Sequence, residues 1–119
     1  MQRMVIKGSE WHRGRTVSKW GLSFLLTPEG RRCCIGIHGR LCGVPDAGML
    51  KVGDVEAMQE DEITECYQPW VDRDGDNSML GTNAMSINDS KKTTDEQKIA
   101  LLRPIFRSIG VTIVWRPSL

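Results

Sequence analysis

Two arginines that lie four residues apart, Arg103 and Arg107, are the polar pair in this chain best suited to binding chemistry. Residues at this spacing share one face of a helix, and a planar guanidinium binds phosphate oxygens in a bidentate manner. The pair could therefore hold a diphosphate. Asn88 and Asp89 precede it, and an amide beside a carboxylate can bind ribose hydroxyls or the edge of a base. A surface arginine pair and a helix cap are the alternative interpretation.

Charge is distributed unevenly along the chain, although the net charge is only +1. Residues 1–53 carry a balance of +6, residues 54–76 a balance of −8, and residues 77–119 a balance of +3. A duplex nucleic-acid binder is normally far more basic, so no duplex is expected as a partner. Ten of the sixteen basic residues are arginine, which favours a small anionic ligand. Trp70 or Met79 could offer that ligand an aromatic or apolar wall.

Residues that could catalyse a reaction are few. The sequence contains no G-x-S-x-G motif, no Walker loop and no H-E-x-x-H motif. His12 and His38 have no carboxylate partner that the sequence identifies, and nothing in the sequence argues for a lowered pKa of Cys34. We therefore predict a binding protein that is not an enzyme and needs no cofactor.

All four cysteines, Cys33, Cys34, Cys42 and Cys66, are predicted to be reduced and buried as small apolar residues. The first two are adjacent, and adjacent cysteines rarely form a disulfide with each other. The spacing Cys-Cys-x7-Cys does not match the common zinc-binding spacings. No metal site is therefore expected at the cysteines.

Residues 72–78 begin like an EF-hand calcium loop, with aspartates at its first, third and fifth positions. The sixth position is Asn77 rather than glycine, and the twelfth is Asn83 rather than the bidentate glutamate. The loss of that carboxylate removes a key ligand, so a plain acidic turn is the favoured interpretation. Calcium binding stays open as the alternative.

Length and hydropathy limit the class of protein. A chain of 119 residues fits one domain, taken here as residues 1–119. No apolar run approaches the roughly 18 residues of a membrane span, so no membrane partner is expected. Arg3 and Lys7 are not followed by a long apolar segment, which argues against a signal peptide. A cytoplasmic location is expected.

Residues 30–43 form the segment around which the rest of the chain is expected to pack. The spacing of four apolar residues indicates one helix face: Cys34, Ile37, Leu41 and Cys42. Gly43 is placed to end this helix in a left-handed conformation. Gly36 and Gly39 each lower helix stability by about 1 kcal/mol relative to alanine, so another backbone or a ligand is expected close to them. Arg31 and Arg32 are expected to face outward.

We predict an α+β fold, in which a small antiparallel sheet packs with about three to four short helices. Alternating apolar residues and β-branched runs place strands near residues 3–7, 20–27 and 111–116. Helical periodicity places helices near residues 33–42, 79–88 and 95–109. Thr94 begins a capping box at the start of the last helix. Pro104 is expected to kink this helix or to divide it near Arg103.

Several short motifs follow one another in a distinctive order. They are a Trp-x-x-Gly, an alternating strand, a Cys-Cys-hydrophobic-Gly, a Cys-Gly, a Trp, an Asn-Asp and a final helix that ends in glycine before a terminal strand. Their positions are residues 11–14, 24–26, 33–36, 42–43, 70, 88–89 and 106–115. This order resembles a family of small phage proteins, the anti-Thoeris nucleotide sponges of the Thoeris anti-defence protein one family.

The resemblance implies a phage protein that acts in the cytoplasm of the infected bacterial host without cleaving its ligand. Such proteins bind and sequester glycocyclic ADP-ribose, the signal that TIR-domain immune enzymes make in Thoeris defence. Some members also hold the cyclic trinucleotides of CBASS immunity at separate sites. The resemblance further implies a homo-oligomer, either a dimer or a hexamer. Four tryptophans in a small chain also suggest more apolar surface than one compact unit hides.

The ligand pockets of the family lie between protomers and use an apolar or aromatic residue, an asparagine and arginines from the C-terminal half. By motif, the corresponding residues of this chain are Trp70 or Met79, Asn88, and Arg103 or Arg107. For the cyclic trinucleotide, charge suggests Arg31, Arg32 and Lys91. Pro104 departs from the family pattern and leaves the direction of the Arg103 side chain open.

A function of another class also stays open. The chain could be a small protein-interaction module that blocks a host factor through its acidic segment, residues 54–76. A nucleotide sponge should change its melting temperature with cyclic nucleotides, because a ligand that binds only the folded state stabilises it. A protein-interaction module should show no such change.

Overall fold

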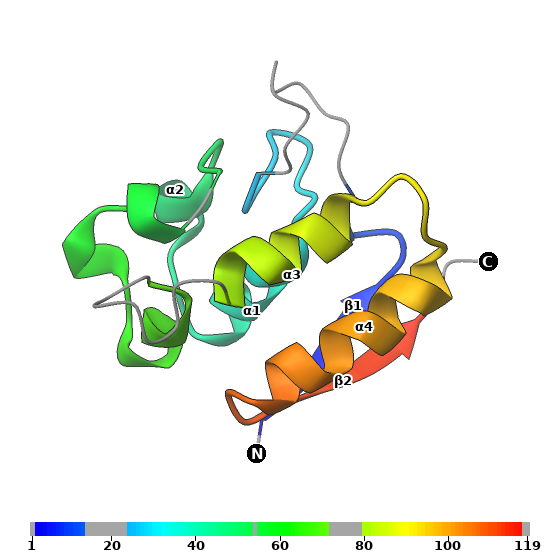
Figure 1. Ribbon diagram of the computed structural model, residues 1–119. Helices are drawn as coiled ribbons and strands as arrows, with labels where there is room; N and C mark the ends of the chain where they lie inside the picture. The colour runs from blue at the N-terminus through cyan, green and yellow to red at the C-terminus, as the bar shows by residue number, and fades with distance from the viewer. Residues whose placement is uncertain (1, 14–23, 54, 72–79, 118–119) are drawn as a thin grey trace.

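The computed structural model describes residues 2–13, 24–53, 55–71 and 80–117, and Figure 1 shows their arrangement. In chain order, the elements are β1 (Gln2–Lys7), α1 (Cys34–Leu41), α2 (Asp46–Met49), η1 (Val55–Ala57), η2 (Glu60–Glu62), η3 (Glu65–Trp70), α3 (Leu80–Asp89), α4 (Asp95–Arg107) and β2 (Val111–Arg116). The predicted α+β class is confirmed. No helix within the described ranges is long and apolar enough to cross a membrane.

The two strands pair in parallel, so the predicted antiparallel sheet is wrong. Gln2 lies opposite Val111, and Lys7 lies opposite Arg116. Parallel strands need a crossover connection, and here the connection includes the helices and ends in α4. Gly110 has a φ of +81° and turns the chain from α4 directly into β2. β2 then runs back along α4, and in that direction it is parallel to β1.

The strand predicted near residues 20–27 does not form in its described part. Residues 20–23 lie outside the described residues, and among residues 24–27 only Leu26 makes a bridge, to Leu50. Leu25 and Leu26 are nevertheless both buried, and the carbonyl oxygen of Leu25 lies against Gly36 of α1. The candidate calcium loop, residues 72–78, also lies outside the described residues.

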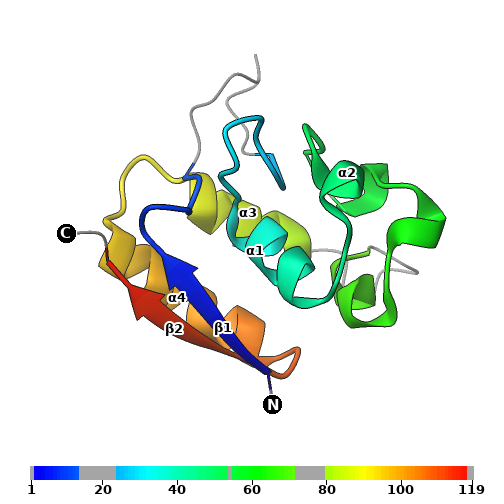
Figure 2. The same cartoon turned by 180° about the vertical axis from the view of Figure 1, so that it is seen from behind.

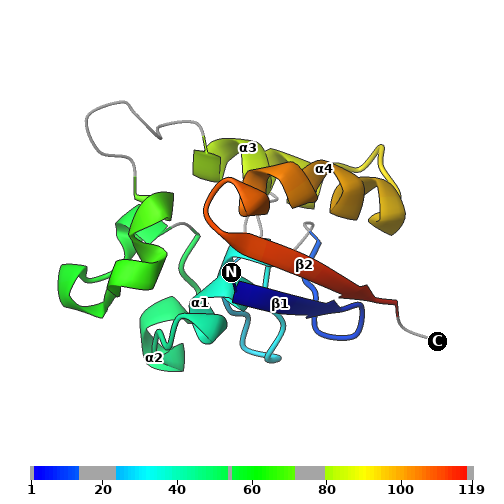
Figure 3. The ribbon, with the colours of Figure 1, turned by 90° about the horizontal axis from the view of Figure 1, so that it is seen from below.

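One face of the sheet is covered by α4, as Figures 1 and 3 show. The buried residues shared by this layer are Ile99, Leu102 and Phe106 of the helix and Met4, Ile6, Val111 and Ile113 of the strands. Alternate residues of a strand point to opposite faces. The other face therefore carries the remaining strand residues, and in Figure 2 no described helix lies in front of it.

The last helix, α4, runs from Asp95 to Arg107 with Pro104 inside it. Of the two predicted effects of Pro104, the division into two helices is wrong, and the kink stays a prediction. The helix begins with the predicted capping box at Thr94. Pro104 lacks the N–H that would bond to the carbonyl of Ala100. Both residues are exposed, so water can bind this carbonyl and the helix can continue past the proline.

The predicted approach of another backbone is confirmed at Gly36 of α1, whereas the neighbours close to Gly39 are side chains. A Cβ atom at Gly36 would lie 1.8 Å from the carbonyl oxygen of Leu25, and one at Gly39 would lie 2.7 Å from Met49 Sδ. Gly43 has a φ of +80°, as expected of the residue that follows a helix. The backbone of α1 therefore packs directly against neighbouring segments, which places this helix at the centre of the molecule.

A disulfide joins Cys42, at the end of α1, to Cys66 in η3, with Cα atoms 5.4 Å apart. The prediction of reduced cysteines is wrong for this pair. Cys33 and Cys34 are free and fully buried, as predicted. The two cysteines of the disulfide lie 24 residues apart in the sequence, and no local pattern connects them.

Candidate functional site

Asn88, at the end of α3, is fully buried in a hydrogen-bond network. Its Oδ1 accepts from Trp11 Nε1 at 2.7 Å and from the backbone N–H of Cys34 at 2.9 Å. Its Nδ2 donates to the carbonyl oxygen of His12 at 3.0 Å and to Asp89 Oδ1 at 2.9 Å. The amide ties three segments of the chain together. The predicted ligand contact of Asn88 is thus replaced by a structural role, and Asp89 belongs to the same network.

Trp70 is also part of the interior, with an exposed fraction of 4%. Its Nε1 donates to His38 Nδ1 at 2.8 Å, and its ring lies 5.0 Å from that of Phe106, centroid to centroid. The predicted stacking wall at Trp70 is therefore wrong, because both the ring and its N–H are already engaged. Met79, the other residue predicted for this role, lies outside the described residues.

Arg32 is buried, so the prediction that it faces outward is wrong. Its Nη2 lies 2.7 Å from Asp46 Oδ1. The hydrogen bond and the charge of this guanidinium lower the pKa of the Asp46 carboxyl. Arg31 is exposed and donates to the carbonyl oxygen of Trp11 at 3.2 Å. Lys91 is exposed, so of the three cations predicted for a trinucleotide, two remain at the surface.

Arg103 and Arg107 are exposed on α4, one turn apart. They are the part of the predicted diphosphate clamp that stays accessible. The structure does not bring the amide of Asn88 to them, since that amide is engaged inside the protein. The clamp on α4 is therefore reduced to a pair of surface arginines.

Four side chains of the described residues that could act as nucleophiles or move a proton, those of Cys33, Cys34, His38 and Tyr67, are buried and held neutral. Burial raises the pKa of Cys33 to about 12 and raises that of Cys34 well above its usual value. Burial also raises the pKa of Tyr67, whose hydroxyl donates to a backbone carbonyl at 2.7 Å. The pKa of His38 is lowered to about 4, again by burial. None of these groups is an activated nucleophile.

A hollow of about 370 Å³ lies between β1 and α1. Its lining consists of Arg3, Met4, Val5, Ile37, Arg40 and Leu41. The two guanidinium groups come from different elements, and Leu41 is exposed by 42%. Arg40 Nη2 also lies 3.2 Å from Glu10 Oε2, in an exposed ion pair. The arrangement combines two cations with an apolar surface, which suits an anion that carries a flat or apolar part.

Basic residues continue from this hollow across the uncovered face of the sheet. Arg3 and Lys7 alternate with buried residues on β1, and Arg116 lies opposite Lys7 on β2. All three are exposed. The sequence prediction missed this surface because Arg3 and Arg40 lie far apart in the chain. The alternation along β1 could have assigned Arg3 and Lys7 to one face, but only the packing of α1 adds Arg40.

The chemistry of the hollow between β1 and α1 follows from the residues that line it. Two exposed arginines line the hollow together with apolar side chains, and the described residues of its lining include no nucleophile and no general base. Such a surface can hold an anion without transforming it. In comparisons with protein families, curated proteins and solved structures, no match to this chain was found.

Proposed function

We propose that this chain is a non-enzymatic binding protein that sequesters a phosphate-bearing nucleotide signal in the hollow between β1 and α1. The observation that carries the proposal is that Arg3 of β1 and Arg40 of α1 line one hollow together with apolar side chains. Glycocyclic ADP-ribose is the ligand that the sequence resemblance implies, with the cyclic trinucleotides of CBASS immunity as a second class.

The hollow matches such a ligand in charge and size. A guanidinium can hold phosphate oxygens in a bidentate manner, and two of them suit a diphosphate. Its volume of about 370 Å³ falls within the range of roughly 300–1,000 Å³ that is usual for small-molecule sites. Leu41, which is exposed by 42%, offers an apolar surface to the base. The exposed Arg40–Glu10 pair contributes little to stability, so a phosphate can replace Glu10 at small cost.

Sequestration rather than cleavage is supported by the chemistry of the lining. Arginine, methionine and aliphatic side chains do not catalyse phosphodiester or glycosidic cleavage at neutral pH. The buried thiols and the buried tyrosine are held neutral by burial and do not line the hollow. A bound nucleotide should therefore be recovered unchanged.

A second copy of the chain fits this proposal. The resemblance implies pockets between protomers, and the uncovered sheet face continues directly from the hollow. Parallel sheets are normally covered on both faces, so a partner on this face would complete both the sheet and the site. Light scattering with and without glycocyclic ADP-ribose tests this part, and a monomer in both conditions would argue against a shared pocket.

The function is tested by incubating the purified protein with glycocyclic ADP-ribose, removing free ligand, and heating the complex. Mass spectrometry should identify the unchanged nucleotide in the released fraction. The melting temperature should also rise, since a ligand at about 100 times its Kd adds about 2.7 kcal/mol to the stability of the folded state. If neither effect occurs with any cyclic nucleotide, the interaction module with the acidic segment 54–76 becomes the better explanation.

A further inference from the structure

We propose that the Cys42–Cys66 disulfide is a thiol–disulfide exchange site, at which an external thiol attacks Cys66 and Cys42 leaves as a thiolate beside the N–H of His38. The substrate class is a small thiol or a dithiol reductant. This chemistry is independent of nucleotide binding between β1 and α1. It is supported by the position of the His38 proton beside Cys42 and by the hollow that Cys66 lines.

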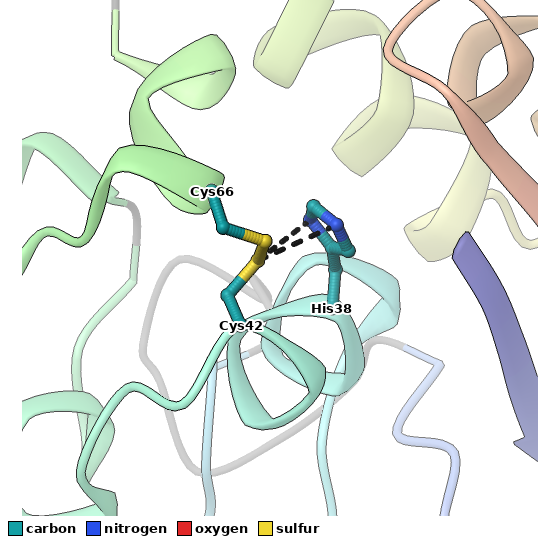
Figure 4. A group of neighbouring side chains, drawn as sticks. All are labelled: His38, Cys42 and Cys66. Carbon is teal, nitrogen blue, oxygen red and sulfur yellow. Dashed lines mark hydrogen bonds between the residues drawn. A yellow bond between two sulfur atoms is a disulfide. The ribbon is translucent and has the colours of Figure 1, made fainter. Parts of the chain in front are cut away.

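The ring of His38 faces the disulfide, as Figure 4 shows. His38 Nε2 lies 3.5 Å from Cys42 Sγ and 3.2 Å from Gln2 Oε1. On the other side of the ring, Trp70 Nε1 lies 2.8 Å from Nδ1. An indole N–H can only donate, so Nδ1 accepts and the proton of the neutral ring is assigned to Nε2. The ring therefore presents an N–H to Cys42 and Gln2.

This N–H favours Cys42 as the leaving sulfur. Burial lowers the pKa of His38 to about 4, so the ring is a neutral donor at neutral pH. A hydrogen bond to an ionised acceptor is roughly twice as strong as one between neutral groups. The N–H can bond to Gln2 while the disulfide is intact and to Cys42 Sγ once that sulfur is a thiolate. A stabilised leaving thiolate makes exchange faster.

Access favours Cys66 as the sulfur that is attacked. Cys66 lines an open hollow of about 860 Å³, whose other lining residues include Thr64, Glu65 and Ile109. Cys42 is not among the described residues that line this hollow. A thiol that enters it therefore meets Cys66 first. Both cysteines are half-buried, and Cys66 Sγ accepts from Gln2 Nε2 at 3.4 Å. The two sulfur atoms therefore differ in that Cys66 alone lines the hollow, whereas Cys42 lies beside His38.

The charge of this hollow selects among thiols. Glu65 lines it and is the one charged side chain among the described residues of its lining. An anionic thiol such as glutathione is repelled by this field, whereas a cationic thiol such as cysteamine is attracted. The preference should weaken at high salt because exposed charges are screened.

The exchange proceeds in two balanced steps. In the first, the external thiolate forms a bond to Cys66 Sγ, the Cys42–Cys66 bond breaks, and Cys42 Sγ keeps the electron pair and takes a proton from water. In the second, another external thiolate attacks the external sulfur of the mixed disulfide and releases Cys66 as a thiolate. Two external thiols are oxidised to a disulfide, and the protein disulfide is reduced to two thiols.

The hydrogen bond from Trp70 Nε1 to His38 Nδ1 also argues against a metal site at His38, Cys42 and Cys66. His38, Cys42 and Cys66 offer ligand atoms within 4.8 Å of one another. A histidine ligand needs a free lone pair, and its other nitrogen usually carries the proton. Here the lone pair of His38 Nδ1 accepts the hydrogen bond from Trp70 Nε1. The proton of the neutral ring therefore lies on Nε2, which points toward the sulfur atoms. A metal ion at Nε2 would force two N–H donors, those of Trp70 and Nδ1, to face each other.

The proposal is tested on the oxidised wild-type protein. The protein is treated with cysteamine, quenched by acid, alkylated and mapped by mass spectrometry. Cysteamine should be found on Cys66 and the alkyl group on Cys42, with Cys33 and Cys34 unmodified because they are buried. Cysteamine on Cys42 instead, or no mixed disulfide in the folded protein while the unfolded protein reacts, would overturn the proposal. Tight binding of Zn²⁺ to the reduced protein would overturn the proton assignment.

Two variants separate the donor role of His38 from a role in packing alone. His38→Leu should slow formation of the mixed disulfide roughly tenfold, because a bond to a charged sulfur is lost in the leaving step. His38→Gln retains a side-chain N–H and should recover part of the rate. If His38→Leu does not fold, the mapping of the wild-type protein still decides. Equal exchange rates for both variants and the wild type would contradict the role of His38.

Discussion

Trp11 and Asn88, which lie 77 positions apart in the sequence, are joined by a hydrogen bond of 2.7 Å between indole Nε1 and amide Oδ1. Both side chains are fully buried, and Trp11 also packs edge-on against Trp115, with ring centroids 5.4 Å apart. The same amide oxygen accepts the first backbone N–H of α1 from Cys34. One buried side chain therefore connects the segment after β1, the start of α1 and the end of α3.

Removing this amide should destabilise the protein strongly. Asn88→Ala leaves the Trp11 indole N–H and the Cys34 backbone N–H buried without their acceptor, and each such group costs about 1–3 kcal/mol. We expect the free energy of unfolding in urea to fall by roughly 2–6 kcal/mol. Asn83→Ala, on the exposed side of the same helix, is the matched control and should change it by no more than about 0.5 kcal/mol. Loss of nucleotide binding without loss of stability would restore Asn88 as a ligand contact.

A methyl group at Gly36 should not be tolerated. The Cβ atom of Gly36→Ala would lie 1.8 Å from the carbonyl oxygen of Leu25, and a backbone atom cannot rotate away. Overpacking of this kind usually costs about 1–3 kcal/mol or more, so the melting temperature should fall clearly. Gly53→Ala has no atom within 4 Å of the added carbon and should melt close to the wild type. Equal melting temperatures for both variants would contradict the close packing of α1.

The ion pair between Arg32 and Asp46 should make stability depend on pH in one direction. Arg32 lowers the pKa of Asp46 from its usual value of 3.8 in the folded state. A lowered carboxyl pKa stabilises the folded state above pH 3.8, and this contribution is lost as the pH falls through the lowered value. The wild type should therefore melt at a higher temperature than Asp46→Asn at pH 7. The difference should shrink steadily below pH 3.8, and a difference that grows there would show that the pair has the opposite effect.

Much of the local structure could be predicted from the sequence because it depends on neighbours in the chain. The capping box at Thr94 and the helix end at Gly43 follow from a few adjacent residues. The close approach at Gly36 was also predictable, since glycine inside a helix is unfavourable unless something lies against it. The identity of that neighbour, the carbonyl of Leu25, was not.

The features that the sequence could not reveal depend on distant contacts. The parallel pairing of β1 with β2 is set by the direction in which α4 returns the chain. The burial of Arg32 depends on Asp46, and the disulfide depends on the position of η3 beside the end of α1. Asn88 is of a residue type that often binds ligands, but its buried hydrogen bonds to Trp11, Cys34, His12 and Asp89 make it structural. Residue type alone does not distinguish these roles.

Calorimetry of glycocyclic ADP-ribose against two pairs of arginine variants tests most directly whether the ligand binds between β1 and α1. Arg3→Ala and Arg40→Ala should each weaken binding about ten- to a hundredfold, since a charge-assisted contact contributes about 1.5–3 kcal/mol. Arg103→Ala and Arg107→Ala, exposed arginines of α4, should bind like the wild type. None of the four should change the melting temperature of the free protein much. Weaker binding in the α4 variants alone, or no binding of any cyclic nucleotide by the wild type, would contradict the proposed site.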